Sequence, residues 1–257
     1  MSRVTALADL TWPETERRAV AGAALAVPVG STEQHGPHLP LSTDTDIAVA
    51  LATRLAARRG DVIVAPAIGY GSSGEHAGFA GTISIGQEAL ELMLVELGRS
   101  AAETFGHIVF ISAHGGNHGP VTRAAERLRA ESRDVLLWTP GRRPGPAPAA
   151  ASAPAAASAP AAAPAPASDA HAGRSETSIQ LALDPGRVRA RLAEPGNLTP
   201  IAELMPVLRS SGVRAASSNG VLGDPVGASA AEGAELLGRL EADLLAAVAA
   251  WLERAPG

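Results

Sequence analysis

The sequence of 257 residues contains no cysteine, which excludes disulfides, thiolate metal sites and cysteine nucleophiles. Positive charge is not in excess, because 21 Lys and Arg stand against 26 Asp and Glu for a formal net charge of −5. Binding to nucleic-acid phosphates requires a basic surface, so we expect no nucleic-acid partner.

Long hydrophobic runs are also absent. No apolar stretch reaches the roughly 20 residues that a membrane-spanning helix needs. The N-terminal segment 1–22 is interrupted by Asp9, Pro13, Glu14 and Glu16 and lacks the basic and then apolar regions of a secretion signal. We therefore expect a soluble, cytoplasmic protein with no membrane partner.

Four short apolar runs predict buried strands, at residues 24–29, 62–67, 107–112 and 135–138. Patterns with helical spacing alternate with them, at residues 45–59, 86–105 and 120–133, and a long amphipathic pattern covers 229–255. Strands that alternate with helices are typical of right-handed crossovers. The pattern therefore predicts an α/β fold with a mainly parallel sheet.

One segment has a different composition. Residues 144–168 consist of Ala, Pro, Ser and Gly, with no charge and no side chain larger than Pro. Such a segment cannot bury enough apolar area to offset the entropy of ordering it. The residues after it, including "GRSETSIQLAL", look like parts of the same fold. We therefore expect a single domain over 1–257 that carries an Ala/Pro-rich surface insert.

Polar side chains follow the predicted strands, where ligands of open parallel sheets bind. Six of the seven histidines lie in three such stretches, "GSTEQHGPHLP", "SSGEHAGF" and "AHGGNHG", and in "DAHAGRSETS", which follows the Ala/Pro-rich segment and opens a helix. These residues are His35, His38, His76, His114, His118 and His171. Imidazoles mixed with carboxylates, without cysteine, suit zinc, manganese or iron. The alternative is a polar loop cluster that only caps strands and helices.

The exact amino-acid sequences of these stretches are informative. "VPVGSTEQHGPHLPLSTD", "GFAGTISIG", "SAHGGNHG", "HAGRSETS" and "GVLGDP" resemble motifs of the creatininase family of metal-dependent amidohydrolases. The resemblance runs from about residue 24 to 240, apart from the insert. It implies a three-layer α/β/α fold, two divalent ions per subunit at the strand ends, and a homo-oligomer, expected to be a hexamer.

The resemblance also implies a role for individual residues. Glu33 and His114 match the ligands of one ion, and His35 and Glu176 match those of the other. Asp44 matches the carboxylate that bridges the two ions.

Two further side chains have competing interpretations. Asp46 is the weaker candidate for the bridging ligand, because creatinine-hydrolysing members of the family lack an acid at that place. His171 matches a catalytic imidazole beside the substrate, and the alternative is that it only supports the ligands.

The charges are consistent with hydrolysis. Two divalent cations against Glu33, Asp44 and Glu176 would leave a charge near +1, which would lower the pKa of a bound water towards roughly 7. The resemblance therefore implies that the ions would supply a hydroxide to attack an amide carbonyl, with His171 giving the leaving nitrogen its proton.

Several positions depart from the creatinine-hydrolysing enzymes. Gly115 and Gly116 stand where those enzymes carry an aromatic residue and an acid. Ser168 and an Ala of the insert stand where they carry Asp and Trp. The groups that hold small, flat creatinine are missing, and the small residues leave room for a larger substrate. Glu75 and His76 either line the substrate pocket or cap the strand that follows them.

Other segments resemble one branch of the family, the actinobacterial peptidases that process the mycofactocin precursor. These segments are "SSGEHAGFAGTISIG", "ETSIQLALDP", "GNLTPIAELMPVLRSSGV" and "SSNGVLGDPVGASAAEG". This resemblance implies a peptidase that trims a short, modified, ribosomally made peptide and releases its C-terminal Val-Tyr-derived fragment. One alternative is an amidohydrolase acting on another cyclic amide or formamide. A more distant alternative is a non-catalytic metal-binding protein.

Overall fold

The computed structural model describes residues 4–141 and 169–254. The insert at 144–168, including Ser168, lies outside the described residues, so its prediction as a surface linker stays a prediction. In chain order the helices and strands are α1 (Trp12–Val20), β1 (Ala24–Val29), α2 (Thr43–Arg58), β2 (Val62–Val64), α3 (Gln87–Ala101), β3 (Ile108–Ser112), α4 (His118–Ala130), β4 (Val135–Trp138), α5 (Arg174–Leu183), α6 (Ile201–Ser211), α7 (Val213–Ala216) and α8 (Ala230–Leu252).

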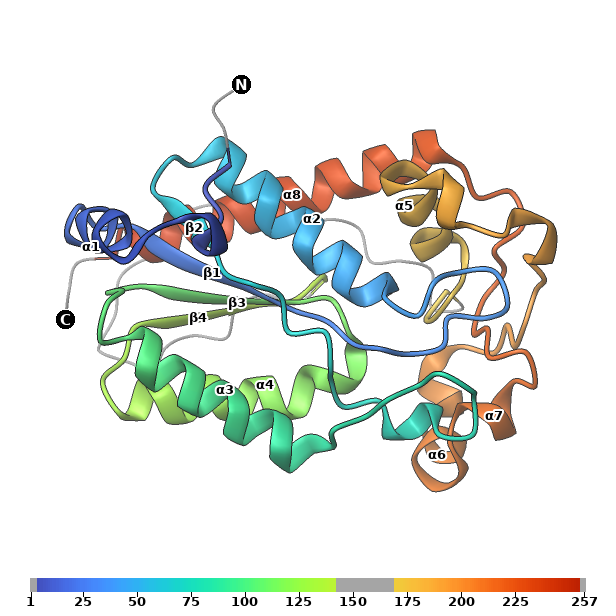
Figure 1. Ribbon diagram of the computed structural model, residues 1–257. Coiled ribbons are helices and arrows are strands. Elements are labelled where there is room, and N and C mark those ends of the chain that lie inside the picture. Colours follow the sequence, from blue (N-terminus) through green and yellow to red (C-terminus); the bar gives the residue numbers. More distant parts are fainter. Residues whose placement is uncertain (1–3, 142–168, 255–257) are drawn as a thin grey trace, which may run out of the picture.

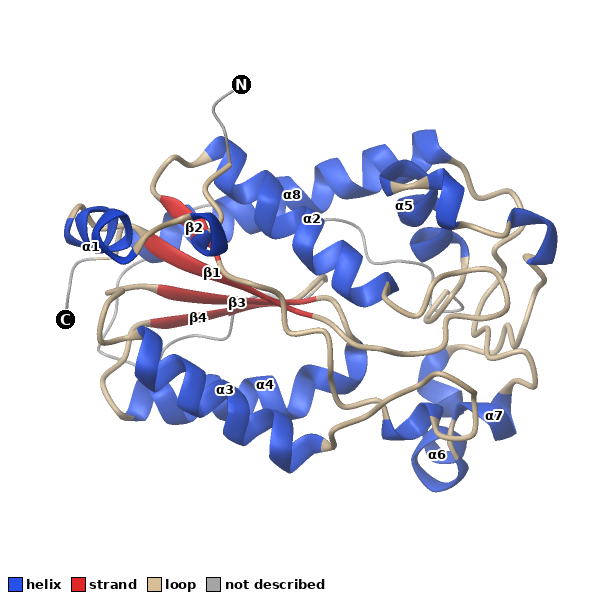
Figure 2. Ribbon diagram, viewed as in Figure 1, coloured by secondary structure: helices blue, strands red, loops and turns tan. Residues whose placement is uncertain are grey.

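The four strands form one sheet in the order β2-β1-β3-β4, and every neighbouring pair is parallel (Figure 2). In the register of the central strands, Ala26 lies opposite Val64 on one side and Val109 on the other. After β1 the chain adds β2 at one side of the sheet, and it then returns to add β3 and β4 at the other. The strand order therefore reverses between β1 and β3, whose carboxyl ends are the expected place for a ligand.

Helices cover both faces of the sheet, which gives the three layers predicted (Figure 1). Alternate strand residues, such as Ala26 and Ile111, pack against α2, α5 and α8. The residues between them, such as Val27 and Phe110, pack against α3 and α4. Successive strand side chains point to opposite faces, so a strand that is buried on both sides is apolar throughout. The fully buried "ALAVPV" of β1 follows this rule.

The predicted elements are confirmed with small shifts at their ends. The strand expected at 62–67 ends at Val64, shortly before Pro66, which has no N–H to donate to a ladder. Sequence reasoning missed α1, although its start carries a capping box: Thr11 N donates to Glu14 Oε2 at 2.8 Å. Within residues 4–141 and 169–254, none of the helices is long and apolar enough to cross a membrane.

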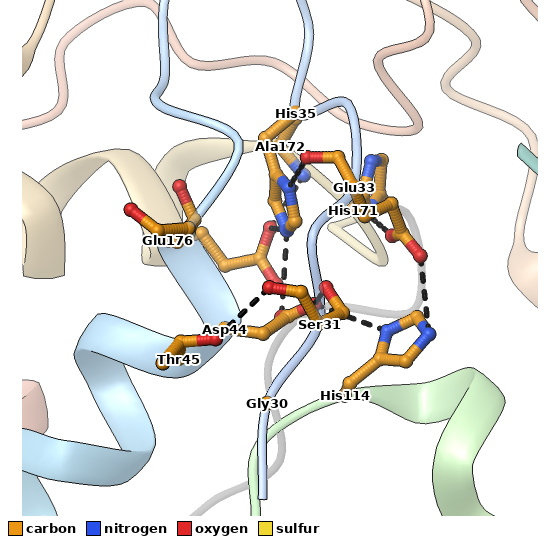
Figure 3. Close-up of polar contacts among 12 residues, drawn as sticks. Gly30, Ser31, Glu33, His35, Asp44, Thr45, His114, His171, Ala172 and Glu176 are labelled. Carbon is orange, nitrogen blue, oxygen red and sulfur yellow. Dashed lines mark hydrogen bonds and ion pairs between the residues drawn. The ribbon is translucent and has the colours of Figure 1, made fainter. Parts of the chain in front are cut away.

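Close packing joins the end of β1 to the start of α2. A Cβ atom on Gly30 would lie 2.3 Å from Thr45 Oγ1 and 2.4 Å from Thr45 Cα, so only glycine fits there. Thr45 Oγ1 donates a hydrogen bond to the carbonyl of Ser31 at 2.9 Å (Figure 3). This contact brings the first turn of α2 against the segment that follows β1, and both carry predicted site residues.

Candidate metal centre

The five predicted ligands come from four separate segments that meet beyond the carboxyl ends of β1 and β3. These residues are Glu33 and His35 after β1, Asp44 in the first turn of α2, His114 after β3 and Glu176 in the first turn of α5 (Figure 3). Four of them are buried, with at most 6% of the residue surface exposed, and Glu176 is partly exposed. The sequence predicted this set, and the structure brings all of it together.

Asp44 lies between the two imidazoles. Its Oδ1 is 3.4 Å from His35 Nε2, and its Oδ2 is 3.1 Å from His114 Nδ1. Ser31 Oγ donates a 2.6 Å hydrogen bond to Oδ2 (Figure 3). The N-terminal turn of α2 also favours a negative side chain, because the unpaired N–H groups there carry partial positive charge. This central position is the one expected of a carboxylate that serves two ions.

The other ligands divide into the two predicted pairs. Glu33 Oε2 lies 3.1 Å from His114 Nε2, and Glu176 Oε2 lies 3.9 Å from His35 Nε2. Overlapping sets of ligand atoms fall within 4.8 Å of one another, among them Glu33, His35 and Asp44. Such spacing allows several of these atoms to bind one ion or a pair of ions.

Some buried atoms here lack a hydrogen bond, which is a direct test of whether the residues fit a cation. Among the described residues, neither carboxylate oxygen of Glu33 nor Nε2 of His35 makes a well-aligned hydrogen bond, although ring nitrogens of His76 and His114 lie 3.1 Å from the Glu33 oxygens. His35 Nδ1 donates to the carbonyl of Glu33 at 3.0 Å, which leaves the lone pair of neutral His35 on Nε2. Buried polar atoms without partners are costly, and a divalent cation would satisfy these three. The donor set therefore fits a metal.

The acids and imidazoles perturb one another strongly. Burial raises the pKa of Glu33 to about 8. Burial opposes charge on His35, but Asp44 and Glu176 outweigh it and raise the pKa of His35 to about 10. The pKa of His114 also rises to about 10, since Asp44 and Glu33 overcome its burial. The cluster of acids thus draws positive charge into a buried site, which metal ions would supply.

Asp46 lies outside the cluster although it is only two residues from Asp44. Its Oδ2 accepts a hydrogen bond from Arg187 Nη1 at 2.8 Å and another from Ser42 Oγ at 3.0 Å. Asp46 therefore joins α2 to the segment after α5. Of the two acids that the sequence left in competition, the structure places Asp44 beside the other predicted ligands.

The predicted catalytic residue and one predicted substrate-binding residue lie beside Glu33. His171 Nδ1 is 3.7 Å from Glu33 Oε1, and His76 Nε2 is 3.1 Å from the same oxygen. The ring centroids of His76 and His171 are 4.4 Å apart. Burial lowers the pKa of His76 to about 3 and that of His171 well below its ordinary value, so both rings are neutral near pH 7.

Gly115, Gly116 and Glu75 surround the mouth of this site. A Cβ atom on Gly115 would meet nothing within 4 Å, so this glycine leaves open space as expected. A Cβ on Gly116 would lie 2.3 Å from Glu75 Oε1 and 2.6 Å from His114 Nε2. The Glu75 carboxylate therefore occupies the space that Gly116 was expected to leave for a substrate. Glu75, Glu33 and His114 also offer possible metal-ligand atoms that lie within 4.8 Å of one another.

Sequence reasoning missed Gln34, a buried residue between two predicted ligands. Its Nε2 lies 2.8 Å from His76 Nδ1 and 3.1 Å from His171 Nε2. Its position inside "STEQHG" was the available signal. His38, which the sequence grouped with the cluster, instead lies 2.8 Å from Thr177 Oγ1 through its Nε2 and belongs to none of the ligand groups found among the described residues.

A cavity of about 1040 Å³ opens over the cluster. It is lined by Glu33, Asp44, His171 and Glu176 of the cluster and by Gly115 and Gly116. Residues of α6 and the turn after it, among them Ile201, Met205 and Leu208, add an apolar side. The predicted site residues other than the fully buried His35 therefore line a common space large enough for a substrate.

Comparisons with known proteins agree with this architecture. The creatininase family model, described as creatinine amidohydrolase, matches residues 8–248. The mycofactocin precursor peptide peptidase of Mycobacterium tuberculosis is 45% identical over 242 residues, covering 91% of this chain and 87% of that protein. The peptidase of the same name from Mycolicibacterium smegmatis is 47% identical over 219 residues, covering 83% and 79%.

Solved structures share the fold. One described as "Creatininase Mn" superposes with a TM-score of 0.78 at 22% identity, covering 98% of this chain and 100% of that one. A crystal structure of creatinine amidohydrolase gives a TM-score of 0.77 at 23% identity, covering 99% and 100%. With the family model matched across most of its length, the chain belongs to the creatininase family.

Proposed function

We propose that this protein is a metal-dependent peptidase that cleaves the modified mycofactocin precursor peptide and releases its C-terminal Val-Tyr-derived fragment. The observation that carries the proposal is the 45% identity to the mycobacterial peptidase across 91% of the chain. By contrast, the creatinine amidohydrolase of Pseudomonas putida matches 33% of the chain, at 38% identity. The resemblance to the peptidases thus extends well beyond the metal motifs.

The cavity supports a substrate larger than creatinine. Its volume of about 1040 Å³ lies at the upper end of the range typical of small-molecule sites. Gly115 offers no side chain to clamp a small ring, and the apolar side formed by Met205 and Leu208 can accept aliphatic or aromatic side chains of a peptide. The cavity lining therefore offers an extended substrate both acidic and apolar groups.

The five clustered ligands would hold two divalent ions. Glu33 and His114 would bind one, His35 and Glu176 the other, and Asp44 both. Zinc, manganese and iron all suit these nitrogen and oxygen donors. When bound, such a pair supplies a hydroxide at neutral pH and polarises the amide carbonyl.

The chain itself positions the peptide and moves the proton. His171 lies against Glu33 with Nδ1 towards the cluster, where it can transfer a proton to the leaving nitrogen of the cleaved amide. Its burial, with 8% exposure, keeps the ring neutral and out of bulk water. The backbone of His171 is held by Leu222, whose N–H donates to the His171 carbonyl at 2.9 Å.

The test is to load the full chain with zinc or manganese and incubate it with the modified precursor peptide and, separately, with creatinine. We expect mass spectrometry to show release of a small Val-Tyr-derived product and negligible creatinine turnover. Asp44→Asn serves as the metal-depleted control and should be inactive. Rapid creatinine hydrolysis, or an intact peptide with turnover of another cyclic amide or a formamide, would favour the amidohydrolase alternative. Metal binding without turnover of any of these would favour the non-catalytic one.

The organisation and location of the protein are part of the same proposal. We propose one domain over 1–257, which the family match to residues 8–248 supports. We also propose a cytoplasmic homo-oligomer, expected to be a hexamer. Sedimentation analysis would measure the assembly directly, and a monomer at micromolar concentration would contradict it.

A further inference from the structure

The side-chain amide of Gln34 has one orientation set by backbone groups. The N–H of Gly36 can only donate, and it lies 2.9 Å from Gln34 Oε1. The carbonyl of Gly220 can only accept, and it lies 3.1 Å from Gln34 Nε2. Gly220 comes this close because it has no side chain: with φ at +79°, its Cβ would lie 2.1 Å from Gln34 Oε1. The two backbone contacts therefore assign oxygen and nitrogen of the amide.

The tautomer of His171 follows from a second backbone group. His171 Nε2 lies 2.8 Å from the main-chain carbonyl of Gln34, which can only accept. Nε2 must then carry a proton. His171 is 8% exposed and its ring packs against the rings of His35 and His76, with centroids 4.3 and 4.4 Å away, an environment that favours a neutral ring with one proton. Nδ1, the nitrogen 3.7 Å from Glu33 Oε1, is left with its lone pair.

His76 has the same tautomer as His171, but its other ring nitrogen faces Glu33. Gln34 Nε2 has two hydrogens, and one is directed to the Gly220 carbonyl. His171 Nε2 already bears a proton, so it cannot accept the other. His76 Nδ1, 2.8 Å away, is the remaining acceptor. A neutral His76 whose Nδ1 accepts carries its proton on Nε2, the nitrogen 3.1 Å from Glu33 Oε1.

We propose that Gln34 is a positioning residue that sets the tautomers of His171 and His76, with His171 keeping a free lone pair at Nδ1 and His76 holding a proton at Nε2, both beside Glu33. His76 then has no lone pair at Nε2 to offer a metal, although it forms a ligand-like group with Glu33 and His171. It faces the Glu33 carboxylate as an N–H group instead. His171 would therefore first accept at Nδ1 the proton that the attacking water loses, and then give it to the leaving nitrogen.

The tautomers can be read directly from the zinc-loaded full chain, because zinc is diamagnetic. With ¹⁵N-labelled histidine, protonated and unprotonated ring nitrogens resonate in separate regions, and spectra of His76→Gln and His171→Gln identify the two rings. We expect Nε2 to be protonated in both rings and neither Nδ1 to be protonated. A protonated Nδ1 on either ring of the unmodified protein would overturn the proposal, and this result needs no Gln34 variant.

Gln34→Glu tests the cause. A carboxylate still accepts from the Gly36 N–H but cannot donate to His76, so His76 should move its proton to Nδ1 while His171 stays protonated at Nε2. Gln87→Glu is the matched control, since Gln87 also lines the cavity and the change in charge is the same. It should leave both tautomers unchanged. An unaltered His76 in Gln34→Glu would contradict the role of Gln34.

The kinetic consequence rests on the proposed peptidase function. In Gln34→Glu we expect kcat for the modified peptide to fall roughly 10–100-fold with KM little changed, as for other groups that orient the surroundings of a metal. The two proposals fail separately. The stated tautomers without peptide cleavage would reject the function alone, and peptide cleavage with different tautomers would reject the role of Gln34 alone.

Discussion

Raising the pH should destabilise the chelator-treated protein, and the reason lies in two buried imidazoles. In the folded chain, Asp44 and neighbouring acids overcome burial and raise the pKa of His35 and of His114 to about 10. The pKa of histidine in an unfolded chain is about 6.5. A group whose folded pKa is raised stabilises the fold fully below its unfolded pKa. That stabilisation is lost as the pH rises towards the folded value.

The size of the effect follows from proton counting. Between about pH 6.5 and 10, each imidazole holds close to one proton more in the folded chain than in the unfolded one. Each therefore lowers the free energy of unfolding by up to about 1.4 kcal/mol per pH unit, or about 2.7 kcal/mol for both. Glu33, whose pKa rises to about 8 on burial, acts in the same direction between about pH 4.5 and 8. For a chain of this length, the two imidazoles alone correspond to a fall in Tm of roughly 5–10 °C per pH unit.

Thermal melts at about pH 7, 8 and 9, followed by circular dichroism, would measure this slope. The matched variants are His35→Gln and His114→Gln, and each should remove about half of the imidazole contribution. Zinc should stabilise the protein more as the pH rises, because its ligands must lose their protons to bind. Equal slopes in the variants and the unmodified protein, or a metal-free protein that gains stability with pH, would refute the reasoning.

Three further outcomes are expected. Asp44→Asn should lose most of both metals and Glu33→Gln mainly one, whereas Asp46→Asn should retain both. Elemental analysis would measure the metal content of each variant. Equal metal loss in the two Asp variants would contradict the assignment of Asp44. His171→Ala should slow peptide cleavage by about 10²–10⁴-fold with normal metal content. Metal loss in this variant would instead make His171 a ligand. Replacing residues 146–166 with a few Gly and Ser should change the free energy of unfolding by only about 1 kcal/mol, because loop closure depends weakly on length. Collapse of the fold in a chemical-denaturation series would show that the insert is structural.

Much of the fold could be predicted because its signals are local. The run "ALAVPV" is apolar at every position, as a strand buried on both faces requires, and it forms β1 at the predicted residues. Helix α1 was missed although the Thr11–Glu14 capping box was readable, because its nine residues are mostly polar and bury no side chain. Element types therefore followed from neighbouring residues, and the missed helix is one with few apolar residues.

The sequence by itself determined the alternation of strands and helices, the family motifs and the residues proposed to bind metal. Tertiary structure decided which of two adjacent acids, Asp44 or Asp46, enters the cluster, because that depends on Arg187 reaching Asp46 from the segment after α5. It also decided that Glu75 fills the space above Gly116. The contacts of Gln34 with His171 and Gly220 span 137 and 186 residues. Local patterning specifies which residue types are present, but only the packing of distant segments specifies which lone pair faces which proton.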